Sequence, residues 1–174
     1  MTDTQATNFD QNQLVYVPHS ALFAPTTPFD FDNVDYRNAL QDHMWNTMVR
    51  HKGIGLAANQ INLDASVFIM KDSNTGLPIF AINPAIHQVS DKKVLMLEGC
   101  LSDPGMFIKV RRPQKIVASW ETIDGERESH EMDGLNARVF LHEYDHLSGV
   151  LFTDRVGRVK LDAARKKQAK LLNG

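Results

Sequence analysis

The sequence has a single cysteine, Cys100, among its 174 residues, so no disulfide can form within the chain. This excludes a small secreted scaffold held by disulfides and favours a reducing compartment. Long apolar runs are also missing, because stretches such as Val67 to Met70 are far shorter than the ~20 residues that a membrane-spanning helix needs. We therefore expect no membrane-spanning segment and no membrane partner.

An excess of either charge is also absent, since 19 Lys and Arg stand against 21 Asp and Glu and give a formal net charge of −2. This balance excludes a strongly basic nucleic-acid binder, and 43% hydrophobic residues exclude a wholly disordered chain. No Lys or Arg precedes Arg37. Secretory signals begin with a basic segment and organelle transit peptides are usually rich in arginine, so we expect a cytoplasmic protein.

The length suits one globular domain that buries its own core without disulfides. We expect residues 1–13, which are polar and lack an apolar period, to be a disordered lead-in. Residues 14–154 should form the functional domain. Residues 155–174 should form a basic helix, because they carry seven Lys and Arg against Asp162 alone.

Two interpretations of the basic helix stay open. It can be a solvated surface helix that packs through one stripe of small and aliphatic residues, namely Leu161, Ala164 and Leu171. Alternatively, its excess of six positive charges can form an electrostatic docking surface for RNA or another polyanion, such as the ribosome.

The chain predicts two further helices and several strands. Asp32 can cap a helix that ends before Gly53, and its apolar residues recur every four positions, at Tyr36, Leu40, Met44 and Met48. A second helix should run from Leu135 through His142 to about Ser148. Strands are expected near residues 66–70, 77–82 and 94–97, and residues 115–122 and 127–132 flank an Asp124-Gly125 hairpin turn.

The segment from His142 to His146 reads His-Glu-Tyr-Asp-His and lies in the second predicted helix. Residues four apart on a helix lie one turn above each other, so both imidazoles can bind one metal ion with Glu143 beside it. The alternative is that the two histidines only cap or line a core helix. The pattern favours a catalytic metal site.

A catalytic metal site commonly has three protein ligands and an open position, so a third ligand is needed. The residues after His146 contain no His and no Glu, which places the third ligand upstream. Cys100 is the best candidate because a thiolate binds transition metals strongly and glycines flank the segment from Glu98 to Gly105. Taken alone, a single cysteine is more often a small buried hydrophobe.

A third segment runs from Gly53 to Gln60 and reads Gly-Ile-Gly-Leu-Ala-Ala-Asn-Gln. Its glycines allow backbone to approach a ligand closely, and the Gln60 amide can donate to a developing oxyanion. The alternative interpretation is that Gly53 only ends the preceding helix and that the apolar residues after it belong to the core.

Together, in this order, Gly53 to Gln60, Glu98 to Ser102 and His142 to Gly149 resemble the three motifs of the peptide deformylase family. The resemblance covers roughly residues 14 to 155. It implies an α+β fold, a single domain in which antiparallel β-sheets surround a central metal-binding helix. It also implies that residues 14–154 are the deformylase catalytic domain.

The resemblance implies that Cys100, His142 and His146 hold one divalent metal ion. The family's native ion is usually Fe²⁺, and Zn²⁺ or Ni²⁺ can substitute for it. Sulfur and imidazole ligands accept all three ions, so the ligand set alone does not choose between them.

The activity that the resemblance implies is hydrolysis that removes the formyl group from the N-terminal formyl-methionine of nascent polypeptides. Glu143 would transfer protons, and the Gln60 amide with the Leu101 backbone N–H would bind the oxyanion. The N-formylmethionyl peptide would pair with backbone near Ile54 and Gly55. Its methionine would enter an apolar pocket lined by Leu135 and Val139, which can equally be core residues.

Two positions beside the second motif leave questions open. Arg112 matches an arginine that is common in the family, and its carboxylate partner can be Asp145 or Glu98. Phe107 stands where bacterial relatives carry an arginine that contacts the peptide backbone. Binding of the peptide beyond its first residues is therefore not fixed by the resemblance.

Three other functions share some of these sequence features. A zincin-like endopeptidase shares the histidines and Glu143 but does not require Cys100 or Gln60. A catalytically inactive binding module would show an eroded site, and none of the six expected positions is lost. An RNA- or ribosome-binding protein that uses the basic helix is compatible with deformylase activity, since the substrate emerges from a ribosome.

Overall fold

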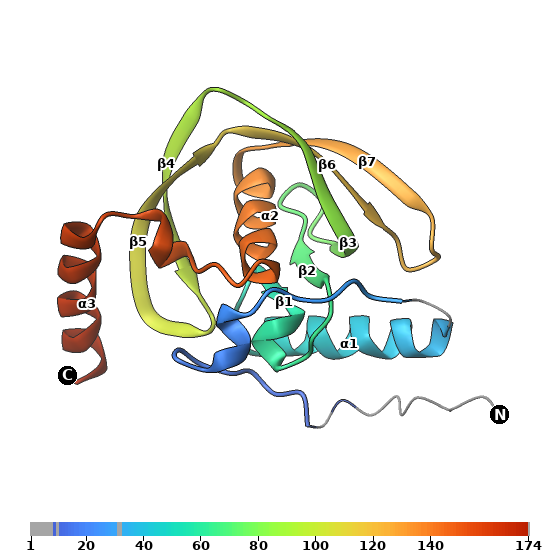
Figure 1. The fold of residues 1–174 in the computed structure, drawn as a ribbon, viewed down its shortest axis with the longest axis horizontal. Coiled ribbons are helices and arrows are strands. Elements are labelled where there is room, and N and C mark those ends of the chain that lie inside the picture. The colour runs from blue at the N-terminus through green and yellow to red at the C-terminus, as the bar shows by residue number, and fades with distance from the viewer. Residues whose placement is uncertain (1–8, 10, 31–32, 174) are drawn as a thin grey trace.

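The computed structural model describes residue 9 and residues 11–30 and 33–173. Within them, a central helix is enclosed by strands, a second helix lies along one side of the molecule, and a third packs on the outside at the C-terminus (Figure 1). The predicted α+β architecture is confirmed. The predicted lead-in lies mainly outside the described residues, although Phe9 is buried and its ring lies 5.1 Å from that of Tyr36.

Helix α1 spans Val34–Arg50, and its N-cap is Asn33, whose side chain accepts from the backbone N–H groups of Asp35 and Tyr36. The expected cap, Asp32, lies outside the described residues. The predicted apolar face is confirmed, since Leu40, Met44 and Met48 are fully buried. They pack against the first strands of the large sheet together with Leu56 and Ile69.

Five antiparallel strands form the larger sheet in the order β1-β2-β3-β6-β7, with β1 at one edge. Their bounds are Gly55–Ala57, Val67–Lys71, Pro78–Val89, Lys115–Glu121 and Arg127–Asp133. The predicted Asp124-Gly125 turn joins β6 to β7, and Gly125 has the positive φ of 83° that a tight turn favours. The strand β1 was not predicted, because three residues are too few to show a period.

Strands β4 (Lys93–Cys100) and β5 (Asp103–Pro113) form a separate two-stranded sheet. The sequence predicted β4 only in part and did not predict β5, because Asp103-Pro104-Gly105 at its start is typical of a turn. The alternation in β5 would have revealed it. Met106, Ile108 and Val110 are buried, whereas the residues between them face outward.

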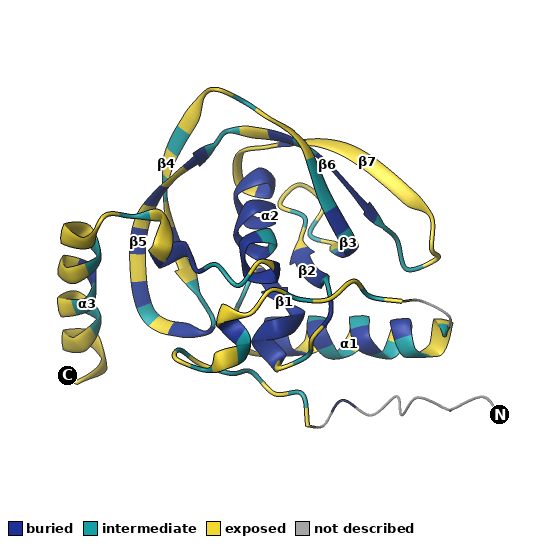
Figure 2. Cartoon of the chain, in the orientation of Figure 1, coloured by how far each residue is buried: buried dark blue, intermediate teal, exposed yellow. Residues whose placement is uncertain are grey.

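Helix α2 spans Gly134–Leu147 and is the most buried helix (Figure 2). It contacts β1, β2, β6 and β7 of the large sheet and also β5. Phe140 anchors it, because its ring meets Phe68 edge-on at 4.9 Å and also lies beside Trp120. The helix that carries the histidine motif is thereby fixed inside the core.

Helix α3 spans Arg158–Leu172 and packs on β5. The expected stripe holds in part. Ala164 is buried and Leu161 packs beside it, but Leu171 is 67% exposed because the helix touches the body through one narrow face. Within the part of the chain that the structure describes, no helix has the length and apolar character needed to cross a membrane.

Candidate active site

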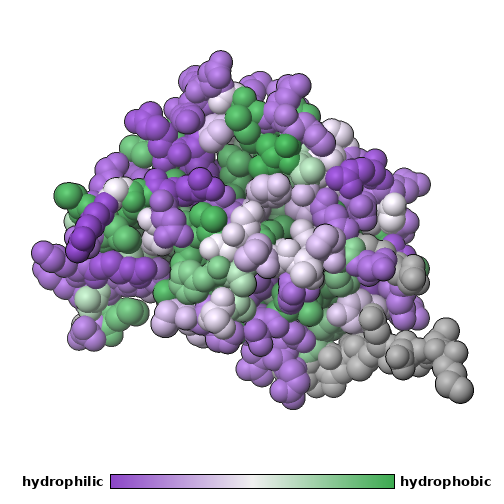
Figure 3. All heavy atoms as spheres, in the orientation of Figure 1, coloured by the Kyte–Doolittle hydropathy of each residue, from purple (hydrophilic) through white to green (hydrophobic). Residues whose placement is uncertain are grey.

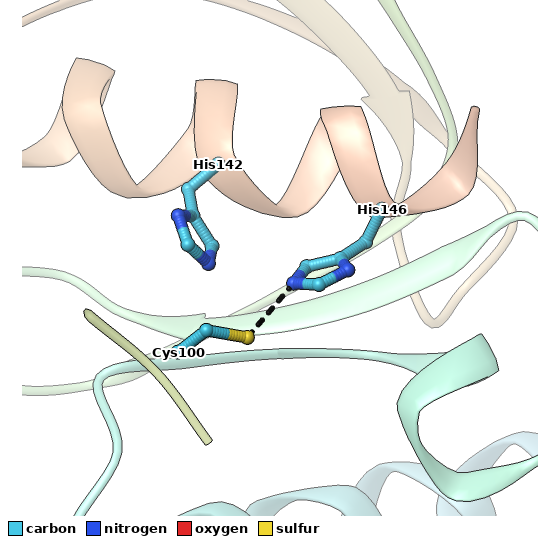
Figure 4. Close-up of side chains that lie close together, drawn as sticks. All are labelled: Cys100, His142 and His146. Carbon is cyan, nitrogen blue, oxygen red and sulfur yellow. Dashed lines mark hydrogen bonds between the residues drawn. The ribbon is translucent and has the colours of Figure 1, made fainter. Parts of the chain in front are cut away.

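Three potential metal ligands meet between α2 and the end of β4. His142 and His146 project from one face of α2 toward Cys100 (Figure 4). The sulfur of Cys100 lies 3.2 Å from Nε2 of His146, and one donor atom from each of the three residues lies within 4.8 Å of the others. The structure therefore brings together the three ligands predicted from the sequence.

The donor set fits a divalent cation. Nδ1 of His142 lies 2.9 Å from Oε2 of Glu98, so it donates to that carboxylate, and the other ring nitrogen, Nε2, faces Cys100 and His146. Burial lowers the pKa of His142, but its hydrogen bonds to Cys100 and Glu98 raise that pKa to about 10. The carboxylate of Glu98 thus favours a positive charge at this position, and a divalent ion bound through Nε2 would supply that charge in place of a proton.

Glu98 fixes the position of the His142 ring, a role that the sequence analysis did not assign to it. Its two oxygens accept from His142, from Arg112 and from Nη1 of Arg138, the last at 2.6 Å. Burial opposes ionisation, yet the hydrogen bonds from His142 and Arg112 hold the pKa of Glu98 far below its ordinary value. The carboxylate therefore stays ionised and can only accept.

Arg112 resolves the choice that the sequence left open, because it binds both candidate carboxylates. Its Nε donates to Glu98 at 2.7 Å, and its Nη1 donates to Asp145 at 2.6 Å. All three side chains are buried. Asp145 lies in the histidine motif and Glu98 in the cysteine motif, so Arg112 ties the two ligand-bearing segments together.

Glu143 lies beside the ligands with one oxygen free. Its Oε2 is buried and has no hydrogen-bond partner within the described residues. Burial raises the pKa of Glu143 to about 7, which is typical of a carboxyl group that exchanges protons near neutral pH. The backbone of Gly55 passes directly against this carboxylate.

The orientation of the Gln60 side chain is fixed by hydrogen bonds at both ends of its amide group. Its Oε1 accepts from the backbone N–H of Ala57 at 2.8 Å, which directs the NH₂ group the other way. Nε2 donates to Oγ of Ser102 at 3.1 Å and lies 3.4 Å from the sulfur of Cys100. A donor therefore faces the ligand cluster.

A cavity of about 550 Å³ opens beside the ligands. Every residue that the sequence proposed for substrate binding or catalysis lines it, namely Ile54, Gly55, Gln60, Leu101, Leu135, Val139 and Glu143. Leu97, Phe107 and Tyr16 also line it and are roughly half exposed or more. The sequence analysis did not assign Leu97 or Tyr16 to the site, and it named Phe107 only as the residue that replaces a peptide-contacting arginine.

Comparison with known proteins agrees with this geometry. Residues 11–162 match the family described as polypeptide deformylase. Peptide deformylase 1B, chloroplastic/mitochondrial, of Arabidopsis thaliana is 39% identical over 158 residues, which are 89% of this chain and 58% of that protein. The chain thus spans less than two thirds of this plant relative. Peptide deformylase of Thermotoga sp. (strain RQ2) is 38% identical over 82% of this chain and 84% of that protein.

Solved structures match over most of the chain. The Arabidopsis thaliana enzyme in complex with an inhibitor has a TM-score of 0.83 and 38% identity, over 91% of this chain and 89% of that one. Peptide deformylase from Plasmodium falciparum has a TM-score of 0.84 and 30% identity, over 92% and 95%. The chain therefore belongs to the peptide deformylase family, hydrolases that remove the formyl group from the N-terminal formyl-methionine of nascent polypeptides.

Proposed function

We propose that this chain hydrolyses formyl-methionyl peptides with Cys100, His142 and His146 as metal ligands and Glu143 as the group that moves protons. The observation that carries the proposal is the free oxygen of Glu143, buried in the cavity beside the three donor atoms. When bound, the divalent ion supplies Lewis-acid chemistry, since it polarises a carbonyl oxygen and lowers the pKa of water.

Glu143 accepts a proton from the water that attacks the formyl carbon. It then returns this proton to the departing amine nitrogen, so that the C–N bond breaks and formic acid is released. Formic acid ionises to formate, the free amine takes up that proton, and the Glu143 carboxyl group ends in its starting state. A carboxyl group with a pKa near 7 can perform both transfers.

The oxyanion donors are the Gln60 side chain and the backbone N–H of Leu101. Negative charge develops on the former carbonyl oxygen as water attacks, and a donor already oriented toward it needs no reorganisation at that moment. The hydrogen bond from Ala57 to Gln60 supports this role because it directs the NH₂ group toward Cys100.

The peptide binds along β1. This strand is an edge of the large sheet, and Ile54 and Gly55 line the cavity on that side. An extended peptide can therefore pair with the backbone as an added strand, while its methionine contacts Leu135 and Val139.

The native ion in this proposal is Fe²⁺, with Zn²⁺ or Ni²⁺ as substitutes. The test is release of formate from formyl-Met-Ala by protein loaded with each metal, with acetyl-Met-Ala as the control. Release from the formyl peptide alone is expected. Cleavage within an unformylated peptide would instead favour a zincin-like endopeptidase.

A second proposal concerns the ribosome. A hollow of about 420 Å³ between the β4–β5 sheet and the start of α3 is lined by five cations and no acid, namely Lys109, Arg111, Arg155, Arg158 and Lys160. Hydrophilic side chains also predominate over α3 at the left of Figure 3. We propose that this basic hollow binds phosphates of ribosomal RNA in the cytoplasm. Cosedimentation with ribosomes should weaken steeply with added salt, because counterions are released on binding.

A further inference from the structure

The inward face of α3 makes polar contacts with the active-site turn, which we define as residues 101–105, the two-residue turn that follows Cys100 together with the first residues of β5. Nη1 of Arg165 donates to both oxygens of Asp103, at 2.9 and 2.8 Å. Nε2 of Gln168 donates to the same carboxylate at 2.6 Å and to the carbonyl oxygen of Pro104 at 2.8 Å. Two helix side chains thus hold both the side chain and the backbone of this turn.

These contacts involve a buried charge. The side chain of Asp103 is 6% exposed, whereas that of Arg165 is 39% exposed. A buried carboxylate that loses a charged donor keeps its desolvation cost, so the segment that carries it must shift to regain solvent or another donor. The position of the turn therefore depends on Arg165.

The turn in question connects to the proposed reaction centre. Asp103 pairs with Cys100 across the β4–β5 hairpin, at an irregularity in the register. Ser102, one residue earlier, accepts the hydrogen bond from Gln60. Leu101 and Pro104 both line the cavity. A displacement of Asp103 would thus move the thiol, the Leu101 N–H and the partner of Gln60.

Apolar contacts fix α3 against the same segment. Gly105 has a φ of +75°, and a Cβ at this position would lie 3.6 Å from side-chain carbons of Gln168 and Leu172. Ala164, one turn earlier, is buried against Met106 and Ile108. The helix is therefore docked on β5 along the length that carries Arg165 and Gln168.

We propose that Arg165 and Gln168 are positioning residues, and that α3 acts as a clamp on residues 100–105. The clamp holds the Cys100 sulfur and the Leu101 N–H in the geometry that the reaction needs. This inference rests on the proposed roles of those two groups. The C-terminal helix lies outside the three motifs in the sequence, yet on this proposal it contributes to turnover.

Three variants test the clamp. Arg165→Met and Gln168→Leu remove the donors but keep the aliphatic contacts, and Arg165→Lys keeps a positive charge. Lys167→Ala is the matched control, since Lys167 is exposed on the same helix. We expect Arg165→Met to lower kcat about 10-fold with a smaller change in KM, and Arg165→Lys to restore part of the loss.

Hydrogen exchange provides a measurement that does not depend on activity. Amide exchange within residues 101–105 of the metal-loaded protein should rise about 10-fold in Arg165→Met, while exchange in β2 stays unchanged. A uniform rise across the protein, or equal kcat in Arg165→Met and Lys167→Ala, would overturn the proposal. If wild-type protein releases no formate, the proposed function fails instead, and the exchange result still decides whether the turn is clamped.

Discussion

The backbone of Gly55 lies in direct contact with the carboxylate of Glu143. A Cβ placed on Gly55 would approach Cδ of Glu143 to 2.8 Å and one carboxylate oxygen more closely still. A side chain at this position would therefore force the Glu143 carboxylate to move. Gly55 thus lies in the strand proposed to bind the peptide and also contacts Glu143, the proposed proton carrier.

Gly55→Ala should therefore displace the Glu143 side chain. We expect kcat to fall at least about 10-fold, because proton transfer depends on the position of the carboxylate. The metal content should stay unchanged, since Glu143 is not a proposed ligand. Gly157→Ala is the control, because a Cβ at Gly157 has no atom within 4 Å. Normal turnover of Gly55→Ala would show that Glu143 can work from another position.

Glu143→Gln keeps the size of the side chain but removes its ability to accept a proton. Turnover should fall by a factor on the order of 10² or more, with about one metal ion still bound per chain. Steady-state formate release and metal analysis of the same preparation check both points. Loss of the metal from this variant would mean that Glu143 is a ligand and not the proton carrier.

Three short motifs predicted residues that the structure places around one cavity, because the groups within each motif lie only a few positions apart. His142, Glu143 and His146 share one helix face, so the period of an α-helix predicts their proximity. Glu98 is different. Its contacts to Arg138 and His142 span about forty residues of sequence, and no local period encodes such a contact.

The fold could be predicted where apolar residues follow one clear period. Helix α1 was predicted in this way, whereas most strands of the large sheet were predicted from short strand-like stretches bounded by turn residues such as Asp124-Gly125. Strand β5 was missed because a proline and a glycine at its start outweighed the alternation that follows. The role of α3 could not be predicted, because Arg165 and Asp103 are far apart in sequence and Arg165 is one of seven cations in the last twenty residues.

Asp72 predicts a dependence of stability on pH. Hydrogen bonds from the Asn74 backbone and from the Asn136 side chain hold the pKa of Asp72 below its ordinary value. A depressed pKa means that the stabilisation is present above the ordinary carboxyl pKa and is lost as the pH falls through the folded value. Asn136 lies in the first turn of α2, so the bond ties the end of β2 to the metal-binding helix.

Asp72→Asn should therefore lower the Tm at about pH 7, and the difference from wild type should narrow toward about pH 3. Thermal unfolding of the metal-free protein at several pH values measures this, which keeps metal loss out of the comparison. Asp124→Asn, in an exposed turn, is the control. A constant difference across the pH range would contradict an electrostatic origin.

Phe107 should strengthen binding of the peptide beyond its first residue. The side chain lines the cavity, and the residue is 58% exposed. A neighbouring apolar side chain of the peptide can cover it and release water. Phe107→Ala should raise the KM for formyl-Met-Leu about 3-fold or more and change the KM for formyl-Met-Ala less.

Leu95→Ala is the matched control for Phe107→Ala. Leu95 is also exposed on the small sheet, but it lines the basic hollow and not the main cavity. The Leu95 variant should keep both KM values. Equal changes in KM for the two peptides in the Phe107 variant would mean that Phe107 shapes the cavity without contacting the second residue.

Removal of α3 distinguishes two roles of this helix. In one, the helix supports the active-site turn, and in the other it is only an electrostatic docking surface. Cutting the chain after Gly157 exposes Met106 and Ile108, which pack beneath Ala164. We expect the Tm to fall by about 5 °C or more. The cut also removes Arg165 and Gln168, so kcat should fall as it does in Arg165→Met. If the helix were only an electrostatic docking surface, its removal would leave both the Tm and kcat unchanged.

Charge reversal isolates the electrostatic role. Arg158→Glu and Lys160→Glu together alter the basic hollow but leave the contacts of Arg165 and Gln168 with Asp103 in place. This variant should keep its kcat on formyl-Met-Ala and lose cosedimentation with ribosomes at low salt. The alternative outcome is that the charge-reversed variant cosediments like wild type while the truncated chain loses turnover. In that case α3 supports the active-site turn, and its basic residues serve only to solvate the outer face of the helix.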